Sequence, residues 1–140
     1  MITPERFVHY KINIPNIDTD HYEILFQMSE ISRHASIGNF DGAFDAVLLT
    51  KKEMTAHFTK EEAYMLAINF TFVNHHISEH ATILQAIDSV IHKMSVTRNV
   101  YLVNALSNDL EILFINHIDY FDQQYVSFTN THPSSQLTTY

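Results

Sequence analysis

Cysteine is absent from the 140-residue sequence, and glycine and proline are rare, with two and three copies. Without cysteine the chain can form no disulfide, thiolate zinc site, iron–sulfur cluster or cysteine nucleophile. So little glycine and proline excludes a collagen-like repeat and a turn-dense β-sandwich, and a hydrophobic fraction of 46% excludes a disordered chain. The length leaves room for one globular domain.

Basic residues are also few, with eight Lys and Arg against sixteen Asp and Glu, so the net charge is -8. This balance repels phosphate backbones and anionic membrane surfaces, and we expect neither nucleic acid nor a membrane as a partner. The sequence shows no signal peptide and no apolar run of the roughly 18 residues that a membrane span needs. We therefore expect a cytoplasmic protein, and its acidic surface predicts a monomer.

The residues that are present favour helices. Segments with apolar residues at alternating three- and four-residue steps are separated by the glycine-containing stretch 36–42 and by polar stretches at 69–71 and 95–99. This pattern predicts an all-α fold of four amphipathic helices in an antiparallel up-down-up-down bundle. Gly38 is expected to end the first helix, and Asp41 to cap the second.

We expect a single domain over residues 1–140. It consists of an extended N-terminal arm over about residues 1–17, the bundle over about 18–128 and a polar tail over about 129–140.

Histidine is abundant, with ten copies. The apolar faces of the four segments are interrupted by histidine or glutamate at six positions: His21, His57, Glu61, His76, His80 and His117. The i, i+4 spacing within the second and third segments places both side chains of each pair on one face, one turn apart. Because positions early in one helix and late in the next share a level in an antiparallel bundle, all six should meet at one end of the core.

Six such groups in an apolar core point to a metal. Buried carboxylates and imidazoles are costly without partners, and a metal ion satisfies all of them at once. Neutral imidazoles and carboxylates are ligands of iron, zinc, copper and manganese. A hydrogen-bonded histidine and glutamate network is the alternative, which convergence from four helices disfavours. The apolar face of the second segment contains Glu61 and not Glu62. His75 and Glu79 also have the i, i+4 spacing, but the apolar face of the third segment passes through His76 and His80 and leaves His75 in solvent.

Four motifs resemble those of the hemerythrin family, and the likeness extends over about residues 10–125. The motifs are Asp18-Thr-Asp-His21, His57-Phe-Thr-Lys-Glu61-Glu62, His76-Ile-Ser-Glu-His80 and His117-Ile-Asp-Tyr-Phe-Asp122. The interval between His80 and His117 is similar to that of the bacterial, bacteriohemerythrin-like members.

The resemblance implies reversible dioxygen binding at a non-haem di-iron centre, with two iron ions (Fe2+/Fe3+) and an oxo or hydroxo bridge. It assigns three ligands to one iron (His76, His80 and His117), two to the other (His21 and His57) and two bridging carboxylates (Glu61 and Asp122). The iron with fewer ligands is where oxygen would bind. Asp122 rests on the motif alone, because it lies about 140° around an ideal helix from His117. A local π-type widening of the helix would turn the Asp122 side chain toward the other ligands.

The sequence departs from the family pattern at three places. Where members often carry a proline before the third-helix histidines, Thr71 or Asn69 is expected to cap that helix. Phe7 takes the place of a frequent tryptophan in the arm. Leu113-Phe114 stands where a Trp-Leu pair is common, which predicts that Phe114 lines the oxygen pocket.

Five neutral imidazoles and two carboxylates favour reversible binding, since fewer anionic ligands stabilise the ferric state less. We expect an oxygen carrier, store or sensor, not an enzyme. A sensor would need a separate signalling or oxygen-using partner. Two alternatives stay open. The same residues could serve a di-iron enzyme, such as an oxidase, a peroxidase or a nitric-oxide-handling protein. A structural zinc bundle is the other, although structural zinc sites are usually closed and four-coordinate.

Overall fold

The computed structural model describes residue 12 and residues 14–131 of the chain. This part is helical outside its short connections and contains no strand. Its elements are α2 (Pro15–Ser36), α3 (Phe40–Ala67), α4 (Val73–Val96), α5 (Val100–His117), the π-helix η2 (Ile118–Asp122) and α6 (Gln123–Thr131). The prediction of an all-α chain with four main helical segments is confirmed.

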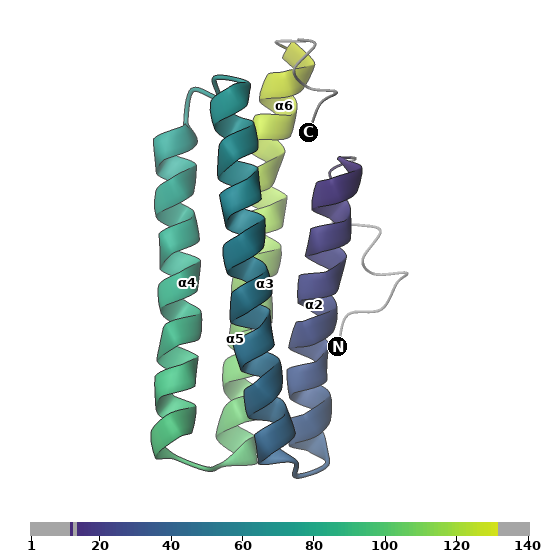
Figure 1. The fold of residues 1–140 in the computed structure, drawn as a ribbon, viewed down its shortest axis with the longest axis vertical. Helices are drawn as coiled ribbons and strands as arrows, with labels where there is room; N and C mark the ends of the chain where they lie inside the picture. Colours follow the sequence, from purple (N-terminus) through teal and green to yellow (C-terminus); the bar gives the residue numbers. More distant parts are fainter. Residues whose placement is uncertain (1–11, 13, 132–140) are drawn as a thin grey trace.

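The four helical rods lie side by side along the long axis of the molecule, and η2 and α6 continue the rod of α5 (Figure 1). The chain runs down α2, up α3, down α4 and up α5 in this view. Helix α2 packs against α3 and α5, and α4 packs against the same two helices. The start of α2, the end of α3, the start of α4 and the end of α5 therefore lie toward the same end of the molecule (Figure 1).

The connection between α2 and α3 is built around Gly38 and Asn39. Gly38 has a φ of 75°. The backbone N–H groups of Gly38 and Asn39 donate to the carbonyls of Ala35 and His34 at 3.1 and 2.9 Å, the hydrogen-bond pattern of a Schellman motif. Asn39, and not the predicted Asp41, caps α3, because its side chain accepts a hydrogen bond from the N–H of Gly42 at 3.0 Å.

The connection between α3 and α4 differs from the prediction. Asn69, with a φ of 56°, ends α3, and the N–H groups of Asn69 and Phe70 donate to the carbonyls of Leu66 and Met65. The N-cap of α4 is Phe72, which makes no side-chain cap. The expectation that Thr71 or Asn69 caps α4 is therefore wrong, since the polar residue Asn69 ends the preceding helix instead.

The helical region is longer than predicted at both ends. Helix α2 begins at Pro15, whose fixed φ suits the first helical position, and α6 continues to Thr131. Ile12 is buried, and its N–H donates to the carboxylate of Asp18 at 2.7 Å. Residues 1–11 and 13 of the predicted arm, including Phe7, and the tail from residue 132 lie outside the described residues.

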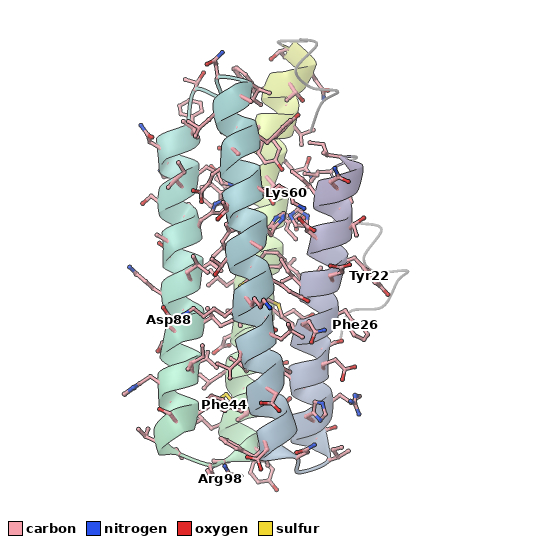
Figure 2. All side chains as sticks on the ribbon, viewed as in Figure 1. Tyr22, Phe26, Phe44, Lys60, Asp88 and Arg98 are labelled. Carbon is pink, nitrogen blue, oxygen red and sulfur yellow. The ribbon has the colours of Figure 1, made fainter. Side chains whose placement is uncertain are left out.

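Side chains fill the space between the rods (Figure 2). The apolar core includes Met28, Met54, Ile87 and Val103, all fully buried. Among the described residues, no helix is long and apolar enough to cross a membrane. The core supplies an apolar surround for the polar residues that lie within it.

Candidate metal centre

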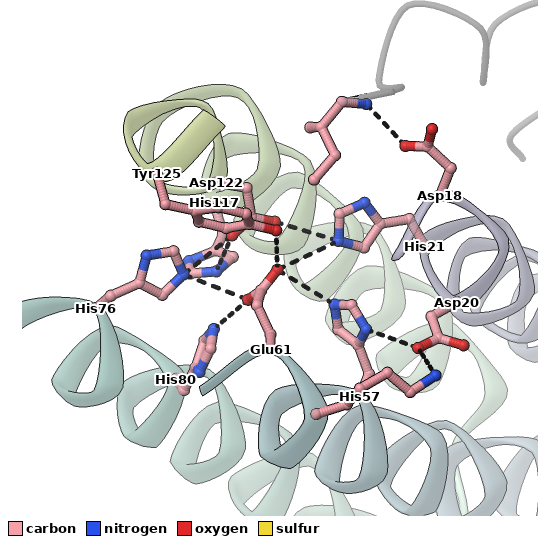
Figure 3. Close-up of polar contacts among 12 residues, drawn as sticks. Asp18, Asp20, His21, His57, Glu61, His76, His80, His117, Asp122 and Tyr125 are labelled. Carbon is pink, nitrogen blue, oxygen red and sulfur yellow. Dashed lines mark hydrogen bonds and ion pairs between the residues drawn. The ribbon is translucent and has the colours of Figure 1, made fainter. Parts of the chain in front are cut away.

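The polar side chains predicted on the apolar faces come together in the core (Figure 3). Each rod supplies at least one of them, and all seven predicted ligand side chains are at most 2% exposed. These are His21 from α2, His57 and Glu61 from α3, His76 and His80 from α4, His117 from α5 and Asp122 from η2. The structure thus gathers every predicted ligand into one buried cluster.

Asp122 reaches the cluster because the helix widens after α5. Residues Ile118–Asp122 form a π-helix, whose hydrogen bonds join residues five apart. Asp122 is consequently brought over His117, five positions earlier, and its Oδ1 lies 3.0 Å from the Nε2 of His117. The Asp122 side chain is fully buried. In a regular α-helix the same residue would be turned away from the core.

Glu61 faces imidazoles on two sides. Its Oε1 lies 2.8 Å from the Nε2 of His80 and 3.3 Å from that of His76. Its Oε2 lies 3.6 Å from the Nε2 of His57 and 4.0 Å from that of His21. The carboxylate therefore separates a group on α4 from a pair on α2 and α3, and offers one oxygen to each.

Asp122 divides its oxygens in the same way. Its Oδ1 lies 3.0 Å from the Nε2 atoms of both His76 and His117. Its Oδ2 lies 3.1 Å from the Nε2 of His21. Two half-sites result, one with three imidazoles (His76, His80 and His117) and one with two (His21 and His57), and the two carboxylates lie between them.

The contacts fit metal ligands better than a hydrogen-bonded network. The Nε2 atoms of His21, His76 and His117 and both Asp122 oxygens are buried without a hydrogen-bond partner among the described residues, although they lie 3.0 to 3.1 Å apart. Adjacent ligands around an octahedral ion with bonds of about 2.1 Å are themselves about 3.0 Å apart. The same nitrogen, Nε2, faces the carboxylates from all five imidazoles. The cluster can therefore hold metal ions.

The electrostatics of the cluster keep both carboxylates ionised. Burial and the neighbouring Asp122 oppose ionisation of Glu61, but His76 and His80 outweigh them and hold the pKa of Glu61 well below its usual value. Burial likewise opposes ionisation of Asp122, and His117 and His21 hold its pKa low. Burial lowers the pKa of His76, but the two carboxylates outweigh burial and raise that pKa to about 9. When no metal is bound, the two carboxylates therefore favour the protonated form of His76.

Three residues that were not predicted as site residues contact the predicted ligands. The Nδ1 of His57 lies 3.0 Å from Asp20, and the Nδ1 of His80 lies 2.8 Å from Glu62. The hydroxyl of Tyr125 donates to the Oε2 of Glu61 at 2.8 Å. Tyr125 lies one turn after Asp122 on the rod of α5, and this spacing could have identified it in the sequence as a neighbour of Asp122. Burial, Glu61 and Asp122 all raise the pKa of Tyr125, so its phenol remains a donor.

Phe114 lies beside the two-histidine half. It is fully buried, and its ring meets that of His21 edge-on with centroids 5.7 Å apart. Its centroid lies 6.4 Å from that of Phe58, whose ring stacks on His80 at 3.9 Å. Phe114 is therefore placed to limit the space next to the half-site with fewer ligands.

His75 lies outside the cluster, as predicted. Its side chain is exposed, and its ring contacts Phe121 with centroids 5.5 Å apart. The apolar stripe of α4 thus selected correctly between two overlapping i, i+4 pairs.

The chain matches no protein-family model, no curated protein and no solved structure. The chemistry of the cluster is therefore inferred from its donor atoms and their geometry.

Proposed function

We propose that this chain is a hemerythrin-type protein, an antiparallel four-helix bundle that binds dioxygen reversibly at a non-haem di-iron centre. His76, His80 and His117 would hold one iron, and His21 and His57 would hold the other. Glu61 and Asp122 would contribute carboxylate oxygens to both ions. When bound, the iron pair supplies the electrons that make dioxygen binding possible.

The strongest support for a pair of ions is that both carboxylates divide their two oxygens between the two halves of the cluster. Glu61 and Asp122 each turn one oxygen toward the three-histidine half and the other toward the two-histidine half. A single ion would not need two carboxylates divided in this way. Seven ligands shared by two ions leave open coordination, which suits ligand binding better than a closed structural zinc site.

The composition of the cluster supports reversible binding over oxidation. Five neutral imidazoles and only two carboxylates stabilise a ferric pair less than the four glutamates and two histidines of carboxylate-rich di-iron bundles. The buried side chains around the cluster, among them Phe58 and Phe114, exclude water and the protons it would deliver. The protein would serve as an oxygen carrier, store or sensor, the last with a separate partner.

An optical spectrum of the iron-loaded protein, recorded through cycles of air and argon, tests this function. We expect near-ultraviolet bands and a visible feature that appears with oxygen and disappears under argon over several cycles. Steady release of hydrogen peroxide, without a recoverable oxygen-bound form, would contradict the carrier and favour a di-iron enzyme.

Phe114→Leu is expected to change the oxygen dissociation rate or affinity without loss of iron. The smaller side chain enlarges the space beside His21, because Phe114 is fully buried there. Stopped-flow measurements of oxygen release, together with iron content, provide the readout. Phe44→Leu, toward the opposite end of the bundle (Figure 2), is the matched control. Equal kinetics in Phe114→Leu, Phe44→Leu and the unchanged chain would show that Phe114 does not border the oxygen site.

A further inference from the structure

Two of the five imidazoles in the cluster are supported by a carboxylate on the nitrogen that faces outward. The Nδ1 of His57 pairs with Asp20 at 3.0 Å, and the Nδ1 of His80 pairs with Glu62 at 2.8 Å. Both imidazoles are 1% exposed, whereas Asp20 is 21% and Glu62 28% exposed. Both carboxylates are therefore nearer the surface than the imidazoles they support. Figure 3 shows Asp20 on the side of His57 that faces away from Glu61.

The other three imidazoles lack this support. The Nδ1 atoms of His21, His76 and His117 are buried and have no hydrogen-bond partner within the described part of the chain. Each half of the cluster thus contains one supported imidazole: His57 in the two-histidine half and His80 in the three-histidine half.

We propose that Asp20 and Glu62 are positioning residues, each of which orients one imidazole and so sets the metal affinity of one half of the centre separately. The inference rests on the proposed metal centre. Asp20 supports one of two imidazoles in its half, and Glu62 supports one of three. Metal binding in the two-histidine half should consequently depend more strongly on its carboxylate.

The physical basis is the coupling between the two nitrogens of an imidazole. A carboxylate that accepts a hydrogen bond from Nδ1–H keeps the proton on that nitrogen and leaves the lone pair of Nε2 free for a metal. It also fixes the ring orientation and makes Nε2 a stronger donor. In His57 and His80 the free nitrogen is the one that faces Glu61, at 3.6 and 2.8 Å.

Lys60 holds Asp20 in place. Its ammonium lies 2.7 Å from the same Asp20 oxygen that pairs with His57. Because Lys60 is 42% exposed, this contact can be removed by mutation without opening the core. Lys60→Gln should therefore weaken the support of His57 less than a change of Asp20 itself.

The test is a titration of the metal-free protein with Co2+ under argon, followed through the ligand-field absorption of each bound ion. In the unchanged chain we expect two ions per chain, with the weaker dissociation constant in the two-histidine half because it has fewer ligands. Asp20→Asn should raise the weaker constant about 10- to 100-fold, with Lys60→Gln between it and the unchanged chain. Glu62→Gln should raise the tighter constant by a smaller factor and leave the weaker one unchanged.

The matched control is Glu23→Gln, which neutralises an exposed α2 carboxylate close in sequence to Asp20. Thermal unfolding of every metal-free variant reports whether the fold is preserved, and Asp20→Glu tests rescue by a retained carboxylate. If the unchanged chain binds no Co2+, the metal centre itself is wrong. If it binds two ions and Asp20→Asn and Glu62→Gln behave as Glu23→Gln, the positioning role is overturned while the centre stands. Equal shifts of both constants in both variants would overturn the separate control of the two halves.

Discussion

His57→Ala is expected to abolish reversible oxygen binding while the helices remain intact. The two-histidine half has only His21 and His57 besides the shared carboxylates, so this change removes half of its imidazoles. Iron content should fall from two ions per chain toward one, because the three-histidine half keeps its own ligands. Iron analysis and the oxygen-dependent spectrum measure the loss, and far-ultraviolet circular dichroism verifies the fold.

His75→Ala is the matched control for this prediction. His75 is an exposed histidine next to His76, a predicted ligand, and its ring contacts that of Phe121. Iron content and the oxygen-dependent spectrum should be unchanged in this variant. If His57→Ala and His75→Ala had the same oxygen affinity, the assignment of His57 to the oxygen site would be wrong.

Removal of metal is expected to lower the thermal stability of the chain by a large margin. A ligand that binds only the folded state at about 1,000 times its dissociation constant stabilises that state by about 4 kcal/mol. For a domain of this size each kcal/mol shifts the unfolding midpoint by roughly 2 to 8 °C, so we expect a difference of about 10 °C or more. Thermal unfolding with Zn2+, a redox-inert probe of the same ligands, and with a chelator measures it.

Glu61→Gln provides the control for the stability measurement. It keeps the volume of a fully buried side chain but removes the negative charge shared by both halves. The gain in unfolding midpoint from Zn2+ should become much smaller in this variant. An equal gain in both chains would show that Zn2+ binds elsewhere.

The stability gap between the zinc-loaded and metal-free chains should widen as the pH rises from 6.5 to about 9. In the metal-free chain His76 has a raised pKa, so its proton contributes stability that is complete below the unfolded value of 6.5 and is lost as the pH passes about 9. Proton competition for the imidazoles also weakens over this range. A gap that narrows with rising pH would contradict the role of His76.

The helical architecture and the buried histidines and Glu61 could be predicted because both depend on short-range periodicity. His57 and Glu61, or His76 and His80, share a face for the same reason that the apolar residues of their helices do. Alternating helix directions then place the six groups at one level. Asp122 could be obtained only through the family resemblance, because its inward position requires a π-helix that the apolar stripe does not encode.

The carboxylates outside the cluster could not be predicted in the same way. Asp20 and Glu62 lie off the buried faces, and their roles depend on contacts with His57 and His80 across separate helices. The predicted helix caps were wrong for a related reason. Asn39 and Asp41 have similar capping preferences, and so do Asn69 and Thr71. Within each pair, the backbone path between the two helices decides which residue caps the next helix and which ends the preceding one.

The most direct test of the di-iron centre is the number of irons that each chain retains after reconstitution with Fe2+ under argon and removal of excess metal. Glu61 and Asp122 each divide their oxygens between the two halves, which predicts two. A chain that stays folded with no iron, or that holds a single zinc in preference to iron, would contradict it.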